Sequence, residues 1–420
     1  MTSDETSARR SACHEMLLRL AGRLPDELIT RCRDQVAQSA FGELARAVTF
    51  SVLSANLTLT SADAATLASL LAETGGDKSA LAQVRIDDFD QQTWFFAASP
   101  AGDGAGPGSG LAQEARHTAD ELIDAVTGAL SAEPGTIGAW LAWRLASDSE
   151  PLPPKPVFLV EVGDTADAAT TAARTQHRLA AAGEASPQVE VYYTGDELPA
   201  YQRMARAYGE LAWAAEADPG MQIAPIFDDV DPDAGPVFSP DHPRLDDDEA
   251  TRVAEYLRGG EAVLVTTAQM DDVVDTTRRY CVSMNFRTDG LWVWTEALAY
   301  YAGEYQLEPD PELLAHIRAG GYTVPAVDGV GLHRALALLQ EPADSEPVWT
   351  FGSSQDEYDD EYDSEYDSEY DSEGAEDEDE DEPAGVEDGR PELAPGAPHP
   401  DEASPVPAAA QRPAAPGMTG

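Results

Sequence analysis

The chain has 420 residues, of which 78 are acidic and 26 are basic, so its formal net charge at pH 7 is −52. Nucleic acids and anionic membranes are bound mainly through lysine and arginine, so this excess of carboxylates argues against both as direct ligands. The hydrophobic fraction of 42% suffices for a core over most of the length. The negative electrostatic field of these carboxylates would attract a basic protein as a partner.

The three cysteines, Cys13, Cys32 and Cys281, form neither a disulfide framework nor a Cys-x-x-Cys motif. The first ten residues are polar, and no apolar stretch of a signal peptide follows them. No run of about 20 apolar residues occurs, so we expect no transmembrane helix. These features predict a cytoplasmic protein without disulfides, and no motif indicates a cofactor.

Composition and periodicity predict a mixed α/β (α+β) fold in five parts. Residues 1–98 form a helical region with a short β pair, and residues 99–110 a flexible Gly/Pro linker. Residues 111–150 form a helical segment, and residues 151–350 an α/β domain that ends in a hairpin–helix module. Residues 351–420 form a disordered acidic tail of low complexity.

In the first part, apolar residues recur at helical spacing between residues 11 and 75. Cys13 and Cys32 lie in these apolar stripes and are predicted to be small buried side chains rather than reactive thiols. Thr60 and Asp63 resemble a helix-capping box. Val84 and Ile86 are predicted to form a short β pair with residues 93–96. Further helices are predicted at about 111–131 and 136–146.

The next part alternates between strands and helices. Strands are predicted at 157–162 and 189–193, and helices at 165–182 and 199–217. A right-handed crossover makes the two strands parallel in a small βαβα layer, which could continue into the sheet of the hairpin that follows. Between the layer and the hairpin, a helix is predicted from Asp246 to Gly259 and a strand from Val263 to Thr266.

The clearest local pattern runs from Tyr280 to Trp294, where two apolar-aromatic runs flank Asp289-Gly290. Asp-Gly between such runs predicts an antiparallel hairpin with a type I′ turn, in which both residues have positive φ. Trp292 and Trp294 fall on one face, which the helix predicted at 296–306 should cover. Further helices are predicted from Pro309–Pro311 to Arg318 and at about 328–340.

The pattern R-T-D-G-x-W-x-W at Arg287–Trp294 is followed by Tyr300-Tyr301 and by E-P-D-P-E-L-L-A-H-I-R at Glu308–Arg318. Together these segments resemble a region shared by a family of uncharacterised proteins of high-GC actinobacteria. The resemblance implies a shared fold and an actinobacterial origin, and it implies no activity.

No catalytic motif is present, and no metal site is predicted. Asp229, Asp231 and Asp233 alternate as in a calcium loop, but the glycine and glutamate that such a loop needs at its sixth and twelfth positions are absent. We therefore predict a solvated acidic loop. If the hairpin module has a polar cleft, its candidate ligand-binding residues are Arg287, Asp289, Trp292, Trp294 and His316.

From Asp356 the chain repeats the unit D/S-E-Y-D, continues as alternating Glu and Asp, and ends in Pro and Ala. The last 65 residues carry 23 acids and two arginines, a net charge of −21, which leaves −31 for residues 1–355. Such a segment cannot bury enough apolar surface to order itself, and we predict that residues 352–420 are disordered. Four tyrosines within the repeat could hold arginine-rich partners by charge and cation–π contact: Tyr358, Tyr362, Tyr366 and Tyr370. The alternative is a tail that only maintains solubility.

Three functional hypotheses follow. The first is a non-enzymatic interaction protein whose acidic body and tail bind a basic partner. The second is an enzyme or small-ligand-binding protein with a pocket beside the Arg287–Trp294 hairpin. The third is an antitoxin-like or immunity-like protein that neutralises a basic toxin.

Overall fold

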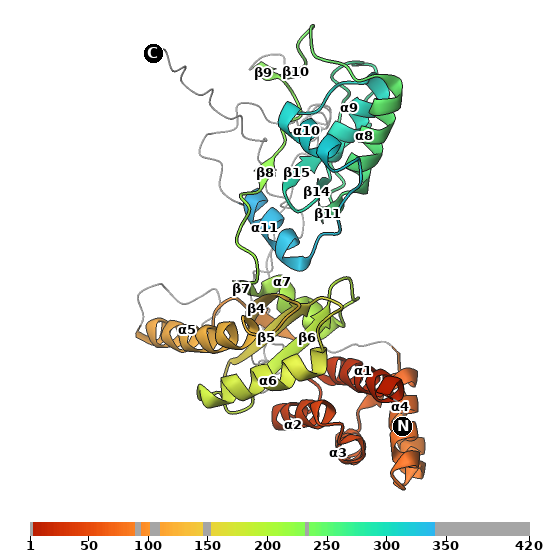
Figure 1. Cartoon of the computed structure of the whole chain (residues 1–420), viewed down its shortest axis with the longest axis vertical. Helices are drawn as coiled ribbons and strands as arrows, with labels where there is room; N and C mark the ends of the chain where they lie inside the picture. Colours follow the sequence, from red (N-terminus) through yellow and green to blue (C-terminus); the bar gives the residue numbers. More distant parts are fainter. Residues whose placement is uncertain (1–2, 89–93, 101–109, 146–152, 232–234, 341–420) are drawn as a thin grey trace, which may run out of the picture.

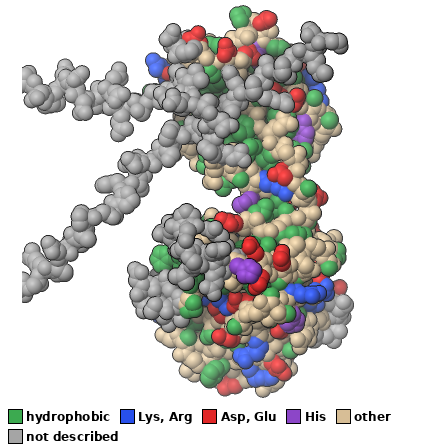
Figure 2. All heavy atoms as spheres, turned by 90° about the vertical axis from the view of Figure 1, so that its left-hand side faces the viewer, with side chains coloured by type: hydrophobic (Ala, Val, Ile, Leu, Met, Phe, Trp, Pro, Cys, Tyr) green, Lys and Arg blue, Asp and Glu red, His purple; other side chains and the backbone are tan. Residues whose placement is uncertain are grey.

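The computed structural model describes residues 3–88, 94–100, 110–145, 153–231 and 235–340, with no side-chain description for Ser3 and residues 110–116. The chain forms two lobes joined by a narrower region (Figures 1 and 2). The N-terminal lobe contains a bundle of helices and a five-stranded sheet, and the C-terminal lobe contains a four-stranded sheet. The mixed α/β fold predicted from the sequence is confirmed.

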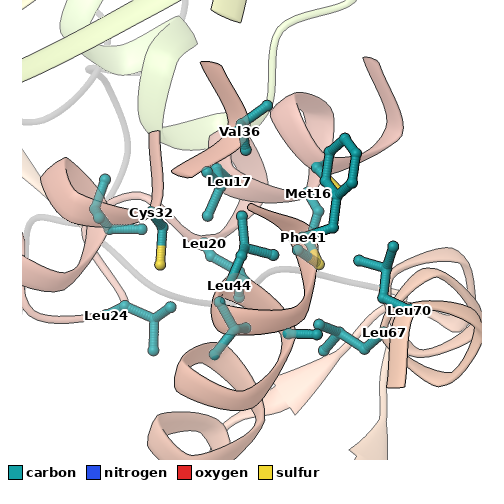
Figure 3. Close-up of a cluster of buried hydrophobic side chains, with 14 of the residues drawn as sticks. Met16, Leu17, Leu20, Leu24, Cys32, Val36, Phe41, Leu44, Leu67 and Leu70 are labelled. Carbon is teal, nitrogen blue, oxygen red and sulfur yellow. The ribbon is translucent and has the colours of Figure 1, made fainter. Parts of the chain in front are cut away.

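Four amphipathic helices open the chain: α1 (Ser3–Leu20), α2 (Asp26–Ala37), α3 (Phe41–Ser54) and α4 (Ser61–Glu73). Their apolar faces converge on one core, in which Leu20, Cys32 and Leu44 have no exposed surface (Figure 3). Burial raises the pKa of the Cys13 thiol to about 12 and that of Cys32 to about 11, so both are inert small hydrophobes, as predicted. The Thr60 side chain accepts the N–H of Asp63 at 3.1 Å, which confirms the predicted cap of α4.

The short β pair predicted near the end of this region is wrong. Strand β2 (Arg85–Ile86), which follows the 3-10 helix η1 (Lys78–Gln83), pairs in parallel with β1 (Thr58–Leu59). Strand β3 (Phe95–Ala97) joins the main sheet instead. Pairing between distant segments overrides the local pattern, which could only suggest neighbours in sequence.

The sheet of the N-terminal lobe has the order β3-β4-β5-β6, with β7 paired to β4 on the same edge as β3. Its further strands are β4 (Thr136–Leu145), β5 (Lys155–Val162), β6 (Gln188–Tyr193) and β7 (Glu210–Ala214). Strands β5 and β6 are parallel, as the sequence predicts, and α6 (Ala168–Ala181) is their crossover. The other pairs are antiparallel.

Two predicted helices in this lobe are wrong. Residues 136–146 were expected to be helical, but Thr136–Leu145 is the long central strand of the sheet. Residues 199–217 were expected to form one helix, but α7 (Ala200–Tyr208) ends before Gly209, and β7 follows. Strand β4 is buried along most of its length and carries a continuous apolar run that does not alternate, so its sequence matches a helical stripe equally well.

Helices cover both faces of this sheet. Helix α5 (Gly110–Leu130), close to its predicted bounds, packs with α6 on one face, where Leu141, Trp143 and Val160 are buried. Helix α7 covers the other face, where Tyr201 packs edge-on against Trp94 at a centroid distance of 5.2 Å. A three-layer arrangement follows, and Figure 1 shows α6 below and α7 above the sheet.

Helices α1 and α2 cover the outer edge of β6. His14 Nε2 lies 2.8 Å from the carbonyl oxygen of Val191. The Thr30 hydroxyl donates to the carbonyl of Pro187, which precedes β6, at 3.0 Å. Arg33 and Glu190 form an ion pair in which both side chains are almost completely buried. The helices thus cover the free edge of β6, whose unpaired backbone groups could otherwise pair with a strand of a second chain.

The sheet of the C-terminal lobe has the order β11-β14-β15-β8 and shares no strand with the first sheet. The βαβα layer therefore does not continue into the hairpin's sheet. The strands of this sheet are β8 (Gln222–Ile223), β11 (Glu261–Leu264), β14 (Phe286–Thr288) and β15 (Trp292–Thr295). Two small hairpins accompany it: β9 (Asp229–Asp231) with β10 (Gly235–Val237), and β12 (Gln269–Met270) with β13 (Val282–Ser283).

The second sheet is covered on both faces. Helices α8 (Asp247–Gly259), α9 (Glu296–Tyr305) and α10 (Pro311–Ala319) pack over Trp292 and Trp294. Helix α11 (Gly329–Gln340) packs over Val293 on the other face. The predicted orientation of the two tryptophans is confirmed, and their cover comes from α8 and α10 as well as from α9.

The hairpin is confirmed, but its turn differs from the prediction. Strand β14 pairs with β15 in the register Arg287↔Trp294, and the Asp289 N–H donates to the carbonyl of Trp292 at 3.3 Å. The turn centre is therefore Gly290-Leu291, and of the predicted pair only Gly290 has positive φ, at 90°. Positive φ at the first central residue alone is typical of a type II′ turn, whereas a type I′ turn has positive φ at both central residues. The first strand is also shorter than predicted, because Val282–Ser283 pairs with β12.

Helix α11 joins the lobes. Its Val330 packs among the residues around Trp140 in the N-terminal lobe, whereas its Ala335 packs with Phe286 and Val293 in the C-terminal lobe. The buried carboxylate of Glu161, at the end of β5, accepts the N–H of Gly329 at 3.0 and 3.1 Å. A carboxylate at this position satisfies the free N–H groups and the positive end of the helix.

In the described part of the chain, no helix is long and apolar enough to cross a membrane. The predicted disordered tail, with its four tyrosines, and most of the predicted linker lie outside the described residues.

Candidate functional site

The structure brings together two of the predicted site residues, Asp289 and His316. Asp289 lies at the hairpin turn with a fully buried side chain, and its Oδ2 accepts from His316 Nε2 at 2.8 Å and from the Tyr256 hydroxyl at 2.6 Å. Its Oδ1 accepts the N–H groups of Leu291 and Trp292 at 2.9 and 2.8 Å. The carboxylate is thus satisfied on both oxygens and fixes the turn to α8 and α10.

This arrangement orients the imidazole of His316, whose side chain is 29% exposed. A carboxylate that accepts from one ring nitrogen leaves the other nitrogen as the basic position, as in hydrolytic triads. Such chemistry also needs a nucleophile. In residues 3–340, as far as they are described, no hydrogen bond joins His316 to a serine, threonine or cysteine. Burial and then the neighbouring Asp289 raise the pKa of Tyr256, which keeps that hydroxyl protonated as a donor.

The other three predicted residues are engaged in packing. Arg287 donates to Glu296 Oε1 and to the carbonyl of Gly260, both at 2.7 Å. Trp294 has no exposed surface, and its Nε1 donates to the carbonyl of Leu257 at 2.9 Å. Trp292 is 8% exposed and belongs to the same core. A ligand-binding role for these residues stays a prediction.

A second buried carboxylate, Asp272, was not among the predicted site residues. It accepts from the hydroxyls of Tyr300, at 2.9 Å, and Tyr305, and from the N–H of Val274 at 2.9 Å. Burial opposes its ionisation, but these donors lower its pKa overall. Asp272 therefore remains a carboxylate that ties the loop after β12 to α9. Tyr300 and Tyr305 follow Asp272 by 28 and 33 residues, so no local spacing in the sequence indicated this contact.

The N-terminal lobe contains a cavity of about 360 Å³ at the edge of its sheet. It lies where β3 and β7 pair with the same edge of β4, next to α5. Leu141 and Trp143 of β4 form part of its wall, and the exposed residues Asp120 and Glu210 contribute its carboxylates. We call this cavity the β4-edge cleft. Its remaining lining residues are Ala98, Ser99, Pro100, Ala119, Ile123, Leu211 and Ala212.

A second cavity, of about 340 Å³, lies between α2 and α3. Glu27 and Arg31 of α2 line it together, so its charges compensate, and Phe50 beside it is 72% exposed. The β4-edge cleft differs because both of its charged residues are acidic. Sequence reasoning missed the cleft because both strands that form its wall, β4 and β7, were predicted to be helical.

Among the described residues, no group of three or more His, Cys, Asp or Glu side chains is placed to hold a metal ion. Of the three alternating aspartates, Asp229 and Asp231 lie on β9, and Asp233 is not described. Comparison of the chain with protein-family models, with curated proteins and with solved structures found no match.

Proposed function

We propose that the protein binds a basic protein partner through its acidic folded body, and that the acidic tail raises the local affinity for that partner. The observation that carries this proposal is the charge of the body, because residues 1–355 alone have a net charge of −31. A field of one sign increases the association rate of a partner of opposite sign and suppresses the binding of acidic competitors.

The exposed carboxylates are unevenly distributed. Around the β9–β10 hairpin and the start of α8, the sequence places many aspartates against few cations, and seven of them are exposed: Asp228, Asp229, Asp231, Asp241, Asp246, Asp247 and Asp248. Asp228 is engaged by His242, at 2.9 Å, and Asp246 caps α8. The exposed side chains of Asp247 and Asp248 add negative charge at the same end of the lobe. Acidic side chains also occur on the face of both lobes in Figure 2.

The tail extends the same charge. With −21 in its last 65 residues, it can hold a basic partner close to the body, because tethering converts a second weak contact into an intramolecular one. Tyrosines within a carboxylate repeat also suit arginine side chains, which combine charge with stacking on aromatic rings.

The test uses the full-length protein and two labelled synthetic peptides of equal length, one rich in arginine and one rich in glutamate. A variant in which the 20 acids of residues 356–388 are changed to amides removes the tail's charge at constant length. We expect the arginine peptide to bind the unaltered protein, with an affinity that falls at high salt. We expect it also to bind the variant, with a lower affinity than it has for the unaltered protein. Equal anisotropy changes for the two peptides would contradict the proposal, and equal affinities of both proteins for the arginine peptide would assign no role to the tail.

A further inference from the structure

The β4-edge cleft arises from a break in the strand order. Strand β3 pairs with β4 from Trp143 to Leu145, and β7 pairs with it from Gly138 to Leu141. Ala142 falls between the two and is paired with neither on that edge, although it pairs with Val157 on the other. The side chains of Leu141 and Trp143 point to the α5 face of the sheet, where the break leaves room for a ligand.

The walls of the cleft are mainly apolar. Leu141 and Trp143 are 4% and 6% exposed, so they form a fixed surface held by the rest of the core. Ile123 from α5 and Leu211 from β7 add to it, and both are half-buried. The volume of about 360 Å³ lies at the lower end of the range of small-ligand pockets.

The charges of the cleft select the ligand. Asp120 of α5 and Glu210 of β7 are its only charged lining residues, and no lysine or arginine lines it among the residues the structure describes. No ion pair with a described side chain involves either carboxylate. The two carboxylates would repel an anionic ligand. A ligand with a cationic group on an apolar stem could pack its stem on the apolar walls and place its charge beside the carboxylates.

We propose that the β4-edge cleft binds an arginine side chain of a basic protein partner. The aliphatic stem of arginine packs on Leu141 and Ile123, and its planar guanidinium lies at Trp143 and donates to Asp120 and Glu210. A lysine ammonium makes neither a bidentate contact nor a stacking contact, so it binds less well. The inference deepens the proposed function by naming the group that the partner supplies, and it depends on that function.

The test uses the full-length protein labelled with ¹³C at isoleucine methyl groups, because Ile123 lies in the cleft and its signal can be assigned with Ile123→Val. The probes are N-acetyl-arginine amide and its neutral analogue N-acetyl-citrulline amide. We expect the arginine probe to shift the Ile123 signal in a saturable manner and the citrulline probe to leave it unchanged. A shift of equal size and affinity with citrulline would overturn the arginine assignment, because the charge would then contribute nothing.

Two variants of equal charge separate the cleft from the general field. In D120N/E210Q both carboxylates of the cleft are neutralised, and in D124N/E216Q two exposed carboxylates of α5 and the segment after β7 are neutralised outside it. We expect the first variant to weaken the arginine probe by about tenfold, since charge-assisted hydrogen bonds are lost, and the second to bind it as the unaltered protein does. Equal weakening in both variants would overturn the inference.

The arginine-rich peptide distinguishes a failure of this inference from a failure of the proposed function. If the peptide binds the unaltered protein but both double variants bind it equally, the acidic body binds basic partners and the cleft is not the site. If the peptide does not bind at all, the proposed function fails, and the inference fails with it.

Discussion

His14 illustrates how one residue connects two parts of the N-terminal lobe. It lies on α1, is 6% exposed, and faces the carbonyl of Val191 on the edge strand β6. A ring nitrogen can approach a carbonyl at 2.8 Å only as a donor, so the neutral ring carries its proton on Nε2. Burial, reinforced by the nearby Arg33 cation, lowers the pKa of His14 to about 4, against the opposing effect of the Val191 hydrogen bond.

This lowered pKa predicts a loss of stability in mild acid. The unfolded chain takes up the His14 proton near pH 6.5 and the folded chain only near pH 4, so the stabilisation is complete above pH 6.5 and is lost as the pH falls to about 4. The difference corresponds to about 3 kcal/mol. We expect His14→Gln, which can still donate to Val191, to flatten this part of a plot of urea-unfolding free energy against pH. The exposed His117→Gln serves as the control, and an unchanged slope in His14→Gln would contradict the assignment.

Close to His14, the buried pair of Arg33 and Glu190 fixes the same interface. Gln202 Nε2 donates to Glu190 Oε2 at 2.8 Å, and Gln176 accepts from Arg33 at 3.4 Å, so amide groups complete the hydrogen bonding of both ions. Burying two ions is costly even when they are paired. The pair therefore contributes to the position of α2 on β6 more than to net stability, because only one arrangement of the helix satisfies both charges.

At the scale of elements, the sequence predicted best where local chemistry decides the structure. The Thr60 cap of α4, the start of α8 next to Asp246 and the β5–α6–β6 unit depend on nearby residues, and all were predicted. Strands β4 and β7 were missed because their burial depends on α5, α7 and α11, whose positions no local pattern reveals. The turn was displaced by one residue because the backbone N–H of Asp289 pairs with the carbonyl of Trp292, which leaves Gly290-Leu291 at the turn centre.

The same contrast holds for the candidate sites. Asp289 and His316 were selected together because they lie near one another in the sequence, and the structure joins them at 2.8 Å. The β4-edge cleft combines residues from position 98 to position 212, and its two carboxylates are 90 residues apart in the chain. No spacing rule connects such positions, since a strand order that places β7 beside β3 must be known first.

Helix α11 is the element on which contact between the lobes depends. Its first residue, Gly329, lies between Glu161 and Arg206, whose Nη2 donates to the Gly329 carbonyl at 3.0 Å. Arg206 also lies 4.3 Å from the centre of the Trp140 ring. A Cβ at position 329 would lie 2.2 Å from both Glu161 Oε2 and Arg206 Nη2, so both side-chain ends would have to move if alanine replaced this glycine.

We predict that Gly329→Ala detaches α11 from the N-terminal lobe. Its methyl group displaces the Glu161 carboxylate and leaves a buried charge without its donors, a loss of about 2–3 kcal/mol. Hydrogen exchange should accelerate in residues 329–340 and remain unchanged in α1 to α4. The control is Gly128→Ala in α5, where a Cβ meets no atom within 4 Å and where alanine should stabilise the helix by roughly 0.5–1 kcal/mol. Unchanged exchange in residues 329–340 of Gly329→Ala would show that the lobes do not depend on this contact.

For the whole molecule, net charge is the property that follows most directly from the sequence and that acts on the folded state as a whole. A chain of net charge −52 repels itself, and the repulsion is greater in the compact state than in the expanded one. The ion pairs act in the opposite direction, but exposed ones such as Arg279 with Asp271 contribute little. The repulsion therefore outweighs the ion pairs, and salt should stabilise the folded state by screening the repulsion.

We expect the midpoint of thermal unfolding to rise as sodium chloride is added, with each kcal/mol of relieved repulsion worth roughly 2–4 °C. The rise should persist when the 20 acids of residues 356–388 are changed to amides, because residues 1–355 keep a net charge of −31 in that variant. Circular dichroism at a helix-sensitive wavelength follows the transition in both proteins. A midpoint that falls with salt would mean that ion pairs outweigh the repulsion. A rise that disappears in the variant would assign the repulsion to the tail. The acidic body would then not be the main source of the electrostatic field that attracts a basic partner.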